Sequence, residues 1–440
     1  MSATVDVTLV TGRRAIEALR NGVPNADAVR VLGTHQPTVE ARFEELLDLV
    51  TDAGQPPEVP VRGLLLSGDF GSGKSHVLEY LEHHADARGF VTSRVVISKE
   101  TPLYDPARLF RAAVESASVP GRHGVAIQEI ALSLRQDSHT YADFYLWANR
   151  PESELAPIFP ATLLLHERLN NDPELVERIR NFWAGDSLPV AVVRQALRQI
   201  GEAAAFSLKA VPTRQLTEQR FRFFAGLIRA AGYAGWMLLI DEVELIGRYS
   251  LLQRSRSYAQ LARWLGRVDG AGIPGLAAVA AITDDFALNV LEERHDRDYV
   301  GTRLRDRGTD EDLITAARAE AGMRLIATDA IKLAPPSNET LRETYERLQA
   351  VHATAYTWEP PDIEIGEVAL TRRMRSHVRR WINEWDLMRL YPGAVLATEE
   401  QRFTMSYGED PAIETDDVMP EDTLAPREPD VDAEATPNDD

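Results

Sequence analysis

Residues 68–75 read GDFGSGKS, so that three glycines precede a lysine and a hydroxyl side chain at fixed spacing. Glycines let the backbone curl and point several N–H groups at one spot, where they can bind the oxygens of a phosphate. Lys74 would reach the β- and γ-phosphates of a nucleoside triphosphate, and the Ser75 hydroxyl would ligate a magnesium ion. The residues predicted to contact the nucleotide are Gly68, Asp69, Phe70, Gly71, Ser72, Gly73, Lys74, Ser75 and His76.

The segments on either side of this phosphate loop support that interpretation. Residues 63–67 form a short apolar run, which is typical of a buried parallel strand. Apolar residues after the loop recur at helical spacing, so a helix should begin there and direct the positive end of its dipole at the phosphates. The alternative is a glycine-rich turn before an ordinary helix, and the agreement of loop and flanks favours the phosphate loop.

A second apolar run, residues 236–240, is followed directly by Asp241 and Glu242. A strand that ends in an acidic pair is the Walker B pattern. Asp241 would hold the magnesium ion, directly or through water, and Glu242 would orient and polarise the attacking water. We expect the strand of Asp241 to lie next to the strand of the phosphate loop. The alternative is a buried strand that ends in a solvated acidic turn. An intact Glu242 favours a hydrolase over a protein that only binds nucleotide.

A third apolar run, residues 276–282, ends at Thr283. A polar residue at the tip of the strand beside the Walker B strand can contact the γ-phosphate or the attacking water, a role called sensor 1. Thr283 is the candidate for this role, and a plain loop start is the alternative interpretation.

Arginines near the end of the chain could sense the nucleotide from a helical lid. Arg372, Arg375 and Arg379 share one face of the last predicted helix, and Arg373 adjoins them. A guanidinium matches phosphate geometry and keeps its charge when it is partly buried. Their place at the helix start favours Arg372 and Arg373 for this role, called sensor 2. A solvated basic face on an amphipathic helix explains the same pattern.

Three further arginines, Arg303, Arg305 and Arg307, lie between the fourth and fifth predicted strands. Oligomeric ATPases carry an arginine finger in this region, which completes the site of the neighbouring subunit. Arg303 and Arg305 are the candidates for such a finger, and a solvated loop is the alternative. A finger would imply that the protein forms a homo-oligomer.

Composition limits the possible classes of function. The chain has 440 residues, of which 44% are hydrophobic, enough for a large core and two or three domains. It contains no cysteine, which excludes disulfides, thiolate catalysis and zinc–cysteine sites. Its apolar runs are too short to span a membrane and its start lacks a signal-peptide pattern, so we expect a soluble, cytoplasmic protein without a membrane partner.

Charge is distributed unevenly along the chain. The net charge is −20, and residues 409–440 contain 13 acidic side chains against the single Arg427. This proline-rich tail has too few apolar groups to offset the entropy of ordering, so we expect it to be disordered. The rest of the chain is also acidic and would not coat DNA by itself, although a local basic groove would still allow DNA binding.

These elements predict an α/β fold, a P-loop NTPase with a parallel sheet flanked by helices. A helical lead-in would occupy residues 1–60, and the ATPase domain would occupy residues 61–333, with further strands near 90–98 and 330–333. The phosphate loop and the Walker B strand are too far apart for one helix and one strand, which indicates a helical insertion at about 105–230. A helical lid at 334–400 and the acidic tail complete the chain.

The order of these elements resembles the AAA+ group of additional-strand ATPases. Three stretches further resemble the BrxD-like ATP-binding proteins of BREX phage-defence systems: residues 13–33 (RRAIEALRNGVPNADAVRVLG), 68–76 (GDFGSGKSH) and 379–393 (RRWINEWDLMRLYPG). The resemblance implies that the nucleotide is ATP, with Mg²⁺. It also implies a defence complex whose other subunits are a DNA methyltransferase, a phosphatase-like protein and large ATPases. The long helical insertion departs from the minimal AAA+ pattern and leaves ring formation open.

Three functions remain compatible with the sequence. The first is an ATPase that drives or regulates a protein–DNA assembly. Glu242 and a finger arginine from another subunit would support this function. The second is a switch or scaffold that does not hydrolyse ATP, but exposes a partner-binding surface when ATP fixes the lid. The third is a DNA-binding module that uses the arginine face of residues 334–400.

Overall fold

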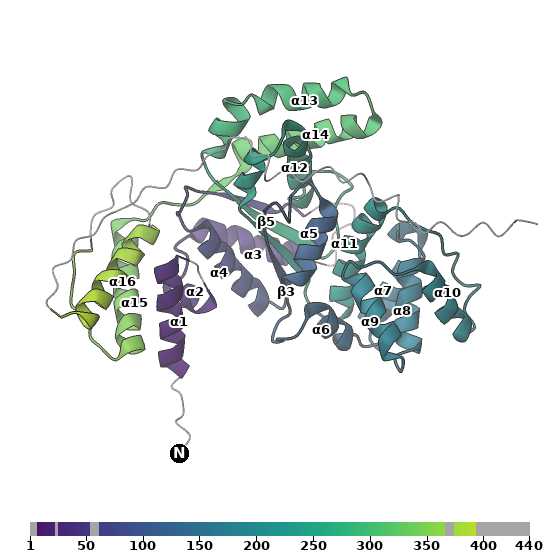
Figure 1. Ribbon diagram of the computed structural model, residues 1–440, viewed down its shortest axis with the longest axis horizontal. Coiled ribbons are helices and arrows are strands. Elements are labelled where there is room, and N and C mark those ends of the chain that lie inside the picture. The colour runs from purple at the N-terminus through teal and green to yellow at the C-terminus, as the bar shows by residue number, and fades with distance from the viewer. Residues whose placement is uncertain (1–6, 23–24, 53–60, 366–373, 393–440) are drawn as a thin grey trace, which may run out of the picture.

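A six-stranded sheet lies at the centre of the protein, with helices on both faces (Figure 1). The structure is a computed structural model, and it describes residues 7–22, 25–52, 61–365 and 374–392. The predicted α/β fold of the P-loop NTPase kind is confirmed. The tail at 409–440 lies outside the described residues. The strands are β1 (Leu64–Ser67), β2 (Val91–Val96), β3 (Ala117–Ser118), β4 (Trp236–Asp241), β5 (Leu276–Ile282) and β6 (Ile331–Lys332).

The strands follow the order β3-β2-β4-β5-β1-β6, and all neighbours are parallel except β3, which runs antiparallel to β2. Strand β5 therefore separates β1, which leads to the phosphate loop, from β4, which ends at Asp241. The prediction that these two strands are neighbours was wrong, because a sequence gives the order of strands along the chain and not across the sheet. Their carboxyl ends still meet at one edge, because the strands are parallel.

Both faces of the sheet are covered, which explains why its central strands are continuously apolar. Every residue of β4 and β5 is buried. Alternate residues of β4 point to opposite faces, so Leu238 and Ile240 belong to one core while Met237 and Leu239 belong to the other. Helices α3 (Pro37–Thr51) and α4 (Lys74–Ala87) cover the second core.

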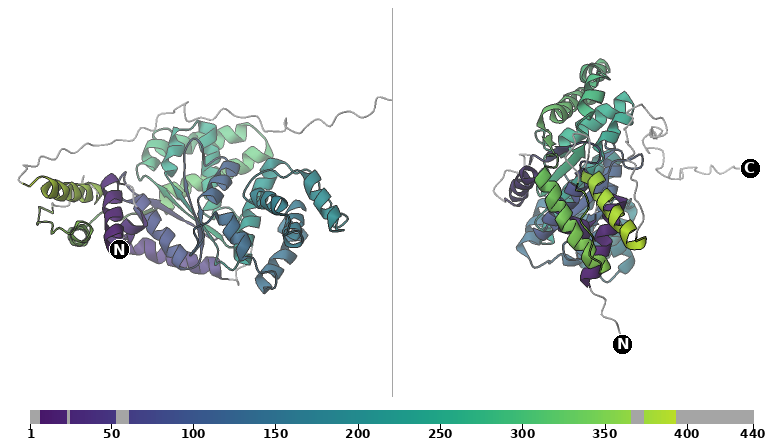
Figure 2. Two further views of the ribbon diagram at one scale, coloured as in Figure 1. Left: turned by 60° about the horizontal axis from the view of Figure 1, so that its bottom comes forward. Right: turned by 90° about the vertical axis from the view of Figure 1, so that its left-hand side faces the viewer.

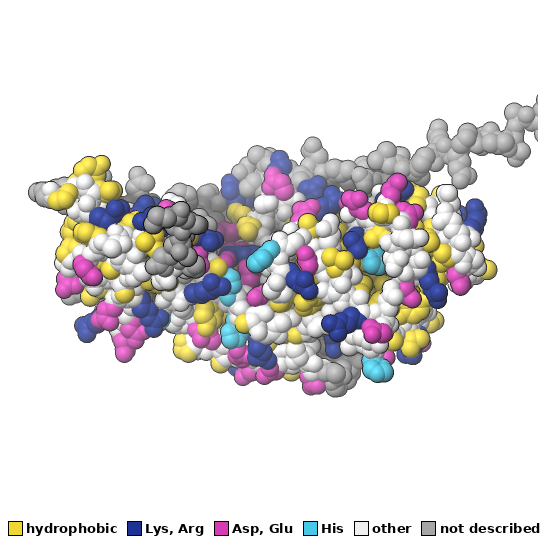
Figure 3. Space-filling view, turned by 90° about the horizontal axis from the view of Figure 1, so that it is seen from below, with side chains coloured by type: hydrophobic (Ala, Val, Ile, Leu, Met, Phe, Trp, Pro, Cys, Tyr) yellow, Lys and Arg dark blue, Asp and Glu magenta, His cyan; other side chains and the backbone are white. Residues whose placement is uncertain are grey.

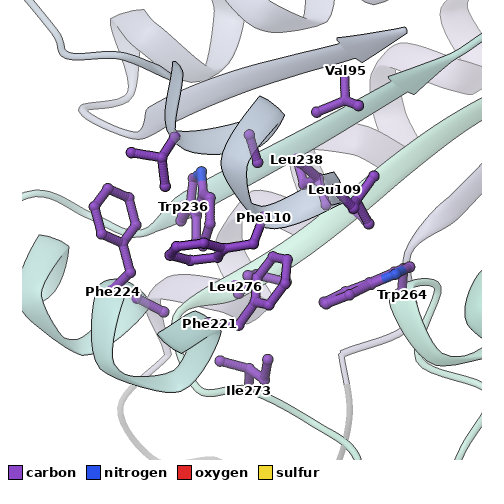
Figure 4. Close-up of a cluster of buried hydrophobic side chains, with 14 of the residues drawn as sticks. Val95, Leu109, Phe110, Phe221, Phe224, Trp236, Leu238, Trp264, Ile273 and Leu276 are labelled. Atoms are coloured by element: carbon purple, nitrogen blue, oxygen red, sulfur yellow. The ribbon is translucent and has the colours of Figure 1, made fainter. Parts of the chain in front are cut away.

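The first core lies under three helices that come from distant parts of the sequence. They are α5 (Pro106–Glu115), α11 (Thr213–Ala230) and α12 (Leu251–Trp264). Trp236 is at its centre: the ring of Phe221 stacks on it with centroids 5.7 Å apart, and Phe224 meets it edge-on at 4.9 Å (Figure 4). The indole N–H of Trp236 donates to the hydroxyl of Ser93 on β2 at 2.8 Å, so this buried donor is satisfied.

Residues between α5 and α11 form a helical lobe beside the sheet (Figure 1). Its apolar faces join the first core rather than a core of their own. The segment predicted as a helical insertion, 105–230, is therefore mostly helical, and its two ends pack on the sheet. The helices of the lobe are α6 (Ala126–Ser133), α7 (His139–Ala148), η1 (Pro151–Ser153), α8 (Ile158–Arg168), α9 (Pro173–Trp183) and α10 (Val190–Gln199).

A helical hairpin follows β5 and packs on α12. A buried ion pair fastens it, because Arg254 of α12 donates from Nε and Nη2 to the carboxylate of Asp296, each at 2.7 Å. The hydroxyl of Tyr258 donates to the same carboxylate at 2.6 Å. The elements of this region are η2 (Val243–Arg248), η3 (Ala287–Glu292), α13 (Asp296–Asp306), α14 (Asp310–Arg324) and η4 (Leu325–Asp329).

The first two helices of the chain pack with the last two, far from them in sequence (Figure 2, right). Their shared core contains the fully buried Trp381 and Trp385. The lead-in is therefore divided between two cores, since α3 packs on the sheet while the preceding helices pack with the lid. We call these four helices the terminal helix group. They are α1 (Val7–Asn21), α2 (Ala26–Leu32), α15 (Asn338–Tyr356) and α16 (Met374–Leu390).

In the part of the chain that the structure describes, no helix has the length and apolar character needed to cross a membrane.

Replacing Phe221 by alanine should lower the free energy of unfolding by about 3–5 kcal/mol, because a cavity would open beneath Trp236. Urea unfolding followed by tryptophan fluorescence measures this change. Leu132→Ala is the matched control, since Leu132 is 69% exposed and its loss should cost no more than about 0.5 kcal/mol. Equal effects of the two substitutions would contradict this description of the core.

Candidate nucleotide-binding site

The loop between β1 and α4 is curled by its glycines. Gly71 and Gly73 have φ angles of +80° and +102°, in the left-handed region that favours glycine. A Cβ on Gly68 would lie 2.5 Å from the hydroxyl oxygen of Ser72, so only glycine allows this close approach. The N–H of Gly68 donates to the carbonyl of Ile282 at 3.2 Å, which ties the loop to the end of β5.

Lys74, the first residue of α4, is 7% exposed. Its ammonium group donates to the carbonyls of Gly68 at 3.0 Å and Asp69 at 3.4 Å, so it lies in the middle of the curled loop. It also lies 3.5 Å from the Oε1 atom of Glu244, a residue that is 1% exposed. A buried cation, a ring of backbone groups and the N-terminus of a helix are thus gathered at one point.

Asp241 lies close to the start of α4, as predicted. One nitrogen of Arg94, Nη2, donates both to the Asp241 Oδ2 atom and to the backbone carbonyl of Ser75, each at 3.0 Å. Both oxygens therefore contact the same guanidinium. The two residues predicted as magnesium ligands, Ser75 and Asp241, are far apart in the sequence and meet at the carboxyl edge of the sheet.

Glu242 follows in a left-handed conformation, with φ of +58°. This turn directs its N–H to the Oδ1 atom of Asp241 at 3.0 Å. Burial, and then the neighbouring charge of Asp241, raises the pKa of the Glu242 carboxyl, while Lys74 and Arg375 act in the opposite direction. Arg375 of α16 is thus within electrostatic reach of Glu242.

Thr283 is buried directly after β5, next to the residue that anchors the phosphate loop. The following residue, Asp284, shares a hydrogen bond with Asp69 of the loop. Burial, and then the charge of Asp69, raises the pKa of the Asp284 carboxyl. The strand end predicted as sensor 1 therefore adjoins the phosphate loop.

A cavity lies between the phosphate loop and the terminal helix group. In the space-filling view a hollow with basic, acidic and histidine side chains around it separates that group from the rest (Figure 3). Residues 33–36 and 334–336 form part of the cavity wall, and Gln36 joins them through two hydrogen bonds with the backbone of Ala334, at 2.8 and 3.0 Å.

His76 also lines this cavity and bonds the carbonyl of Gly33 at 2.7 Å. Burial lowers the pKa of His76, which favours a neutral imidazole. This bond connects the helix that follows the phosphate loop to the end of α2.

The predicted arginines are not all found at the cavity. Arg372 and Arg373 lie outside the described residues, whereas Arg375, on the same predicted face, lines the cavity. Arg303 and Arg305 are exposed on α13, where Arg305 pairs with Glu320, and neither lines the cavity. Within one copy of the chain, the structure therefore does not bring these two arginines to the predicted nucleotide site.

Sequence reasoning did not identify two charged residues of this site. Glu244 stands two residues beyond the predicted acidic pair, and nothing in the local sequence indicated that it would be buried beside Lys74. Arg94 interrupts the otherwise uncharged strand β2. A lone arginine inside a buried strand was a signal that a counter-charge lay nearby.

A family model, the BREX system ATP-binding protein BrxC/D, matches residues 11–132 and 211–387. The chain belongs to this family. Members of the BrxC/D family are ATP-binding proteins, so this chain is an ATP-binding protein of a BREX phage-defence system. The match omits 133–210, which contains α7 to α10 of the helical lobe. No curated protein and no solved structure matches the chain.

Glu244 should give the protein a characteristic pH dependence of stability. Burial raises its pKa to about 7 despite the nearby Lys74. The folded protein then keeps a proton that the unfolded chain has already released, so stability should fall as the pH rises from about 4.5 to about 7. Glu244→Gln should remove this pH dependence, which amounts to a decrease of roughly 3 kcal/mol in the free energy of unfolding across this pH range. Urea unfolding across this pH range measures it.

Glu45→Gln provides the control, since Glu45 is exposed on α3 and its loss should leave the slope unchanged. An unchanged slope in Glu244→Gln would show that Glu244 is ionised in the folded protein throughout this range.

Proposed function

We propose that this protein hydrolyses ATP with Mg²⁺ and that hydrolysis drives or regulates a protein–DNA assembly of the BREX system. One observation carries the proposal: Lys74, Asp241 and Glu242 lie in one connected cluster at the carboxyl edge of the sheet. The expected partners are a DNA methyltransferase, a phosphatase-like protein and a large ATPase, and a cytoplasmic location follows from these partners.

The residues of the loop fit a triphosphate. The hydroxyl of Ser72 is buried without a hydrogen-bond partner among the described residues, and a phosphate oxygen would satisfy it. Backbone N–H groups at the start of α4 and the ammonium of Lys74 would bind the phosphates. The hydroxyl of Ser75 and the carboxylate of Asp241 would hold the magnesium ion, an oxygen donor set that this ion prefers. The bound ion would neutralise charge on the phosphates.

In this proposal Glu242 would accept a proton from the attacking water. Its raised pKa brings it closer to the pH at which a general base works best. The proton would move to the Glu242 carboxylate as the water oxygen forms a bond to the γ-phosphorus. The bond from the γ-phosphorus to the β–γ bridging oxygen would break, and ADP would leave with that oxygen. Thr283 at the end of β5 would orient this water or the γ-phosphate, and Arg375 would offset negative charge from the lid side.

The arrangement of the cavity also supports the second candidate, a switch that binds ATP without turnover. Its walls come both from the phosphate loop and from the terminal helix group, so a nucleotide there would hold the two together. A homo-oligomer is part of the first proposal only, because the exposed Arg303 and Arg305 would have to reach the site of another copy. Sizing by mass, with and without ATP, tests this point.

Two substitutions distinguish hydrolysis from binding. Lys74→Ala should weaken ATP binding by about a hundredfold or more, because a buried cation is removed from the phosphates. Glu242→Gln should keep ATP binding but lower turnover by about a hundredfold or more. Calorimetry measures binding, and release of phosphate measures turnover. Lys99→Ala, which removes an exposed lysine, is the control and should behave like the unmodified protein.

Undiminished turnover in Glu242→Gln would reject the role given to Glu242. Absence of turnover in the unmodified protein, with or without DNA, combined with tight ATP binding would favour the switch.

Arg375→Ala should weaken ATP binding by roughly tenfold, since a guanidinium near the phosphates contributes a charged hydrogen bond. Arg379→Ala is the matched control, because Arg379 lies one helical turn away on α16 and is exposed. Calorimetric titration with ATP compares the two. Equal affinities for both variants would mean that Arg375 lines the cavity without contacting the nucleotide.

A further inference from the structure

Arg94 occupies an unusual position at the predicted metal site. Its side chain is 20% exposed and lies between β4 and α4. The guanidinium has three partners: the carboxylate of Asp241, the backbone carbonyl of Ser75 and the carboxylate of Glu79 on α4. Glu79 accepts from the Nη1 atom of the guanidinium, whereas Asp241 and Ser75 accept from Nη2.

The carboxylate of Asp241 is engaged at both oxygens. Its Oδ1 atom accepts the N–H of Glu242, and its Oδ2 atom accepts Nη2 of Arg94. The Asp241 side chain is only 5% exposed, so its attraction to Arg94 is weakly screened by solvent. A metal ion that binds Asp241 would have to share this carboxylate with the guanidinium of Arg94, which already neutralises the charge of the carboxylate.

We propose that Arg94 is a positioning residue that competes with magnesium for the charge of Asp241, so that the metal is retained only together with a triphosphate. A guanidinium does not lose its proton in proteins, so this competition does not depend on pH. The negative charge of a bound triphosphate would restore the attraction for the ion. The inference rests on the proposed function, because it assumes that Ser75 and Asp241 are the magnesium ligands.

A purely structural role for Arg94 would be to fasten α4 to β2. Both roles predict a loss of stability when Arg94 is replaced, so stability alone does not separate them. Metal affinity does, because only the competition predicts that removing the guanidinium makes magnesium bind more tightly.

The test measures binding of a fluorescent ATP analogue at increasing concentrations of magnesium, with no dependence on turnover. In Arg94→Gln the half-saturating magnesium concentration should fall by roughly tenfold, because a positive charge near a divalent ion is removed. Arg94→Lys keeps the charge and should stay near the unmodified protein. Glu79→Gln leaves the contact with Asp241 in place and should also change the magnesium requirement little. Arg94→Met repeats the test if the glutamine variant does not fold.

An unchanged or higher magnesium requirement in Arg94→Gln would overturn the inference and leave Arg94 a structural or ligand-orienting residue. This result is distinguishable from failure of the proposed function. If the unmodified protein retained the ATP analogue equally well with and without magnesium, or if Asp241→Asn had no effect on the magnesium requirement, the metal site itself would be wrong.

Discussion

Parallel pairing of β5 with both β1 and β4 is the constraint on which the site depends. Ser67 at the end of β1 is in register with Ile282 of β5, and Ile240 of β4 is in register with Ala280. This pairing places the phosphate loop, Thr283 and the acidic pair at one edge of the sheet. Each strand is buried on both faces, so a slip in register would expose apolar side chains and is strongly disfavoured.

Buried charges at this edge are arranged as pairs that cross between the motifs. Lys74 of the phosphate loop lies beside Glu244, which follows β4, and Asp241 lies beside Arg94 of β2. An unpaired charge in such a position would be costly, so the carboxylate of Asp241 needs the guanidinium of Arg94, whereas burial favours the protonated form of Glu244 beside Lys74. A nucleotide and the proposed metal ion would have to replace some of these contacts when they bind. The affinity of the site would then also depend on Arg94 and Glu244, which lie outside the motifs.

The remainder of the chain falls into parts with different relations to this site. The terminal helix group contributes one wall of the cavity through Arg375, and its core of Trp381 and Trp385 joins the two ends of the chain. The helical lobe shares the first core of the sheet but does not line the cavity. The family match omits 133–210, which lies within this lobe.

The sequence by itself determined the local elements: the strand, glycine loop and helix around Lys74, the strand that ends at Asp241, and the family to which these stretches belong. Short apolar runs and glycine positions act locally, so their pattern suffices. Tertiary structure alone decided that β5 lies between β1 and β4, that Arg375 lines the cavity, and that Arg94 and Glu244 join the site. Those contacts link residues far apart in the chain or depend on burial, and neither spacing nor composition encodes which distant charges will meet.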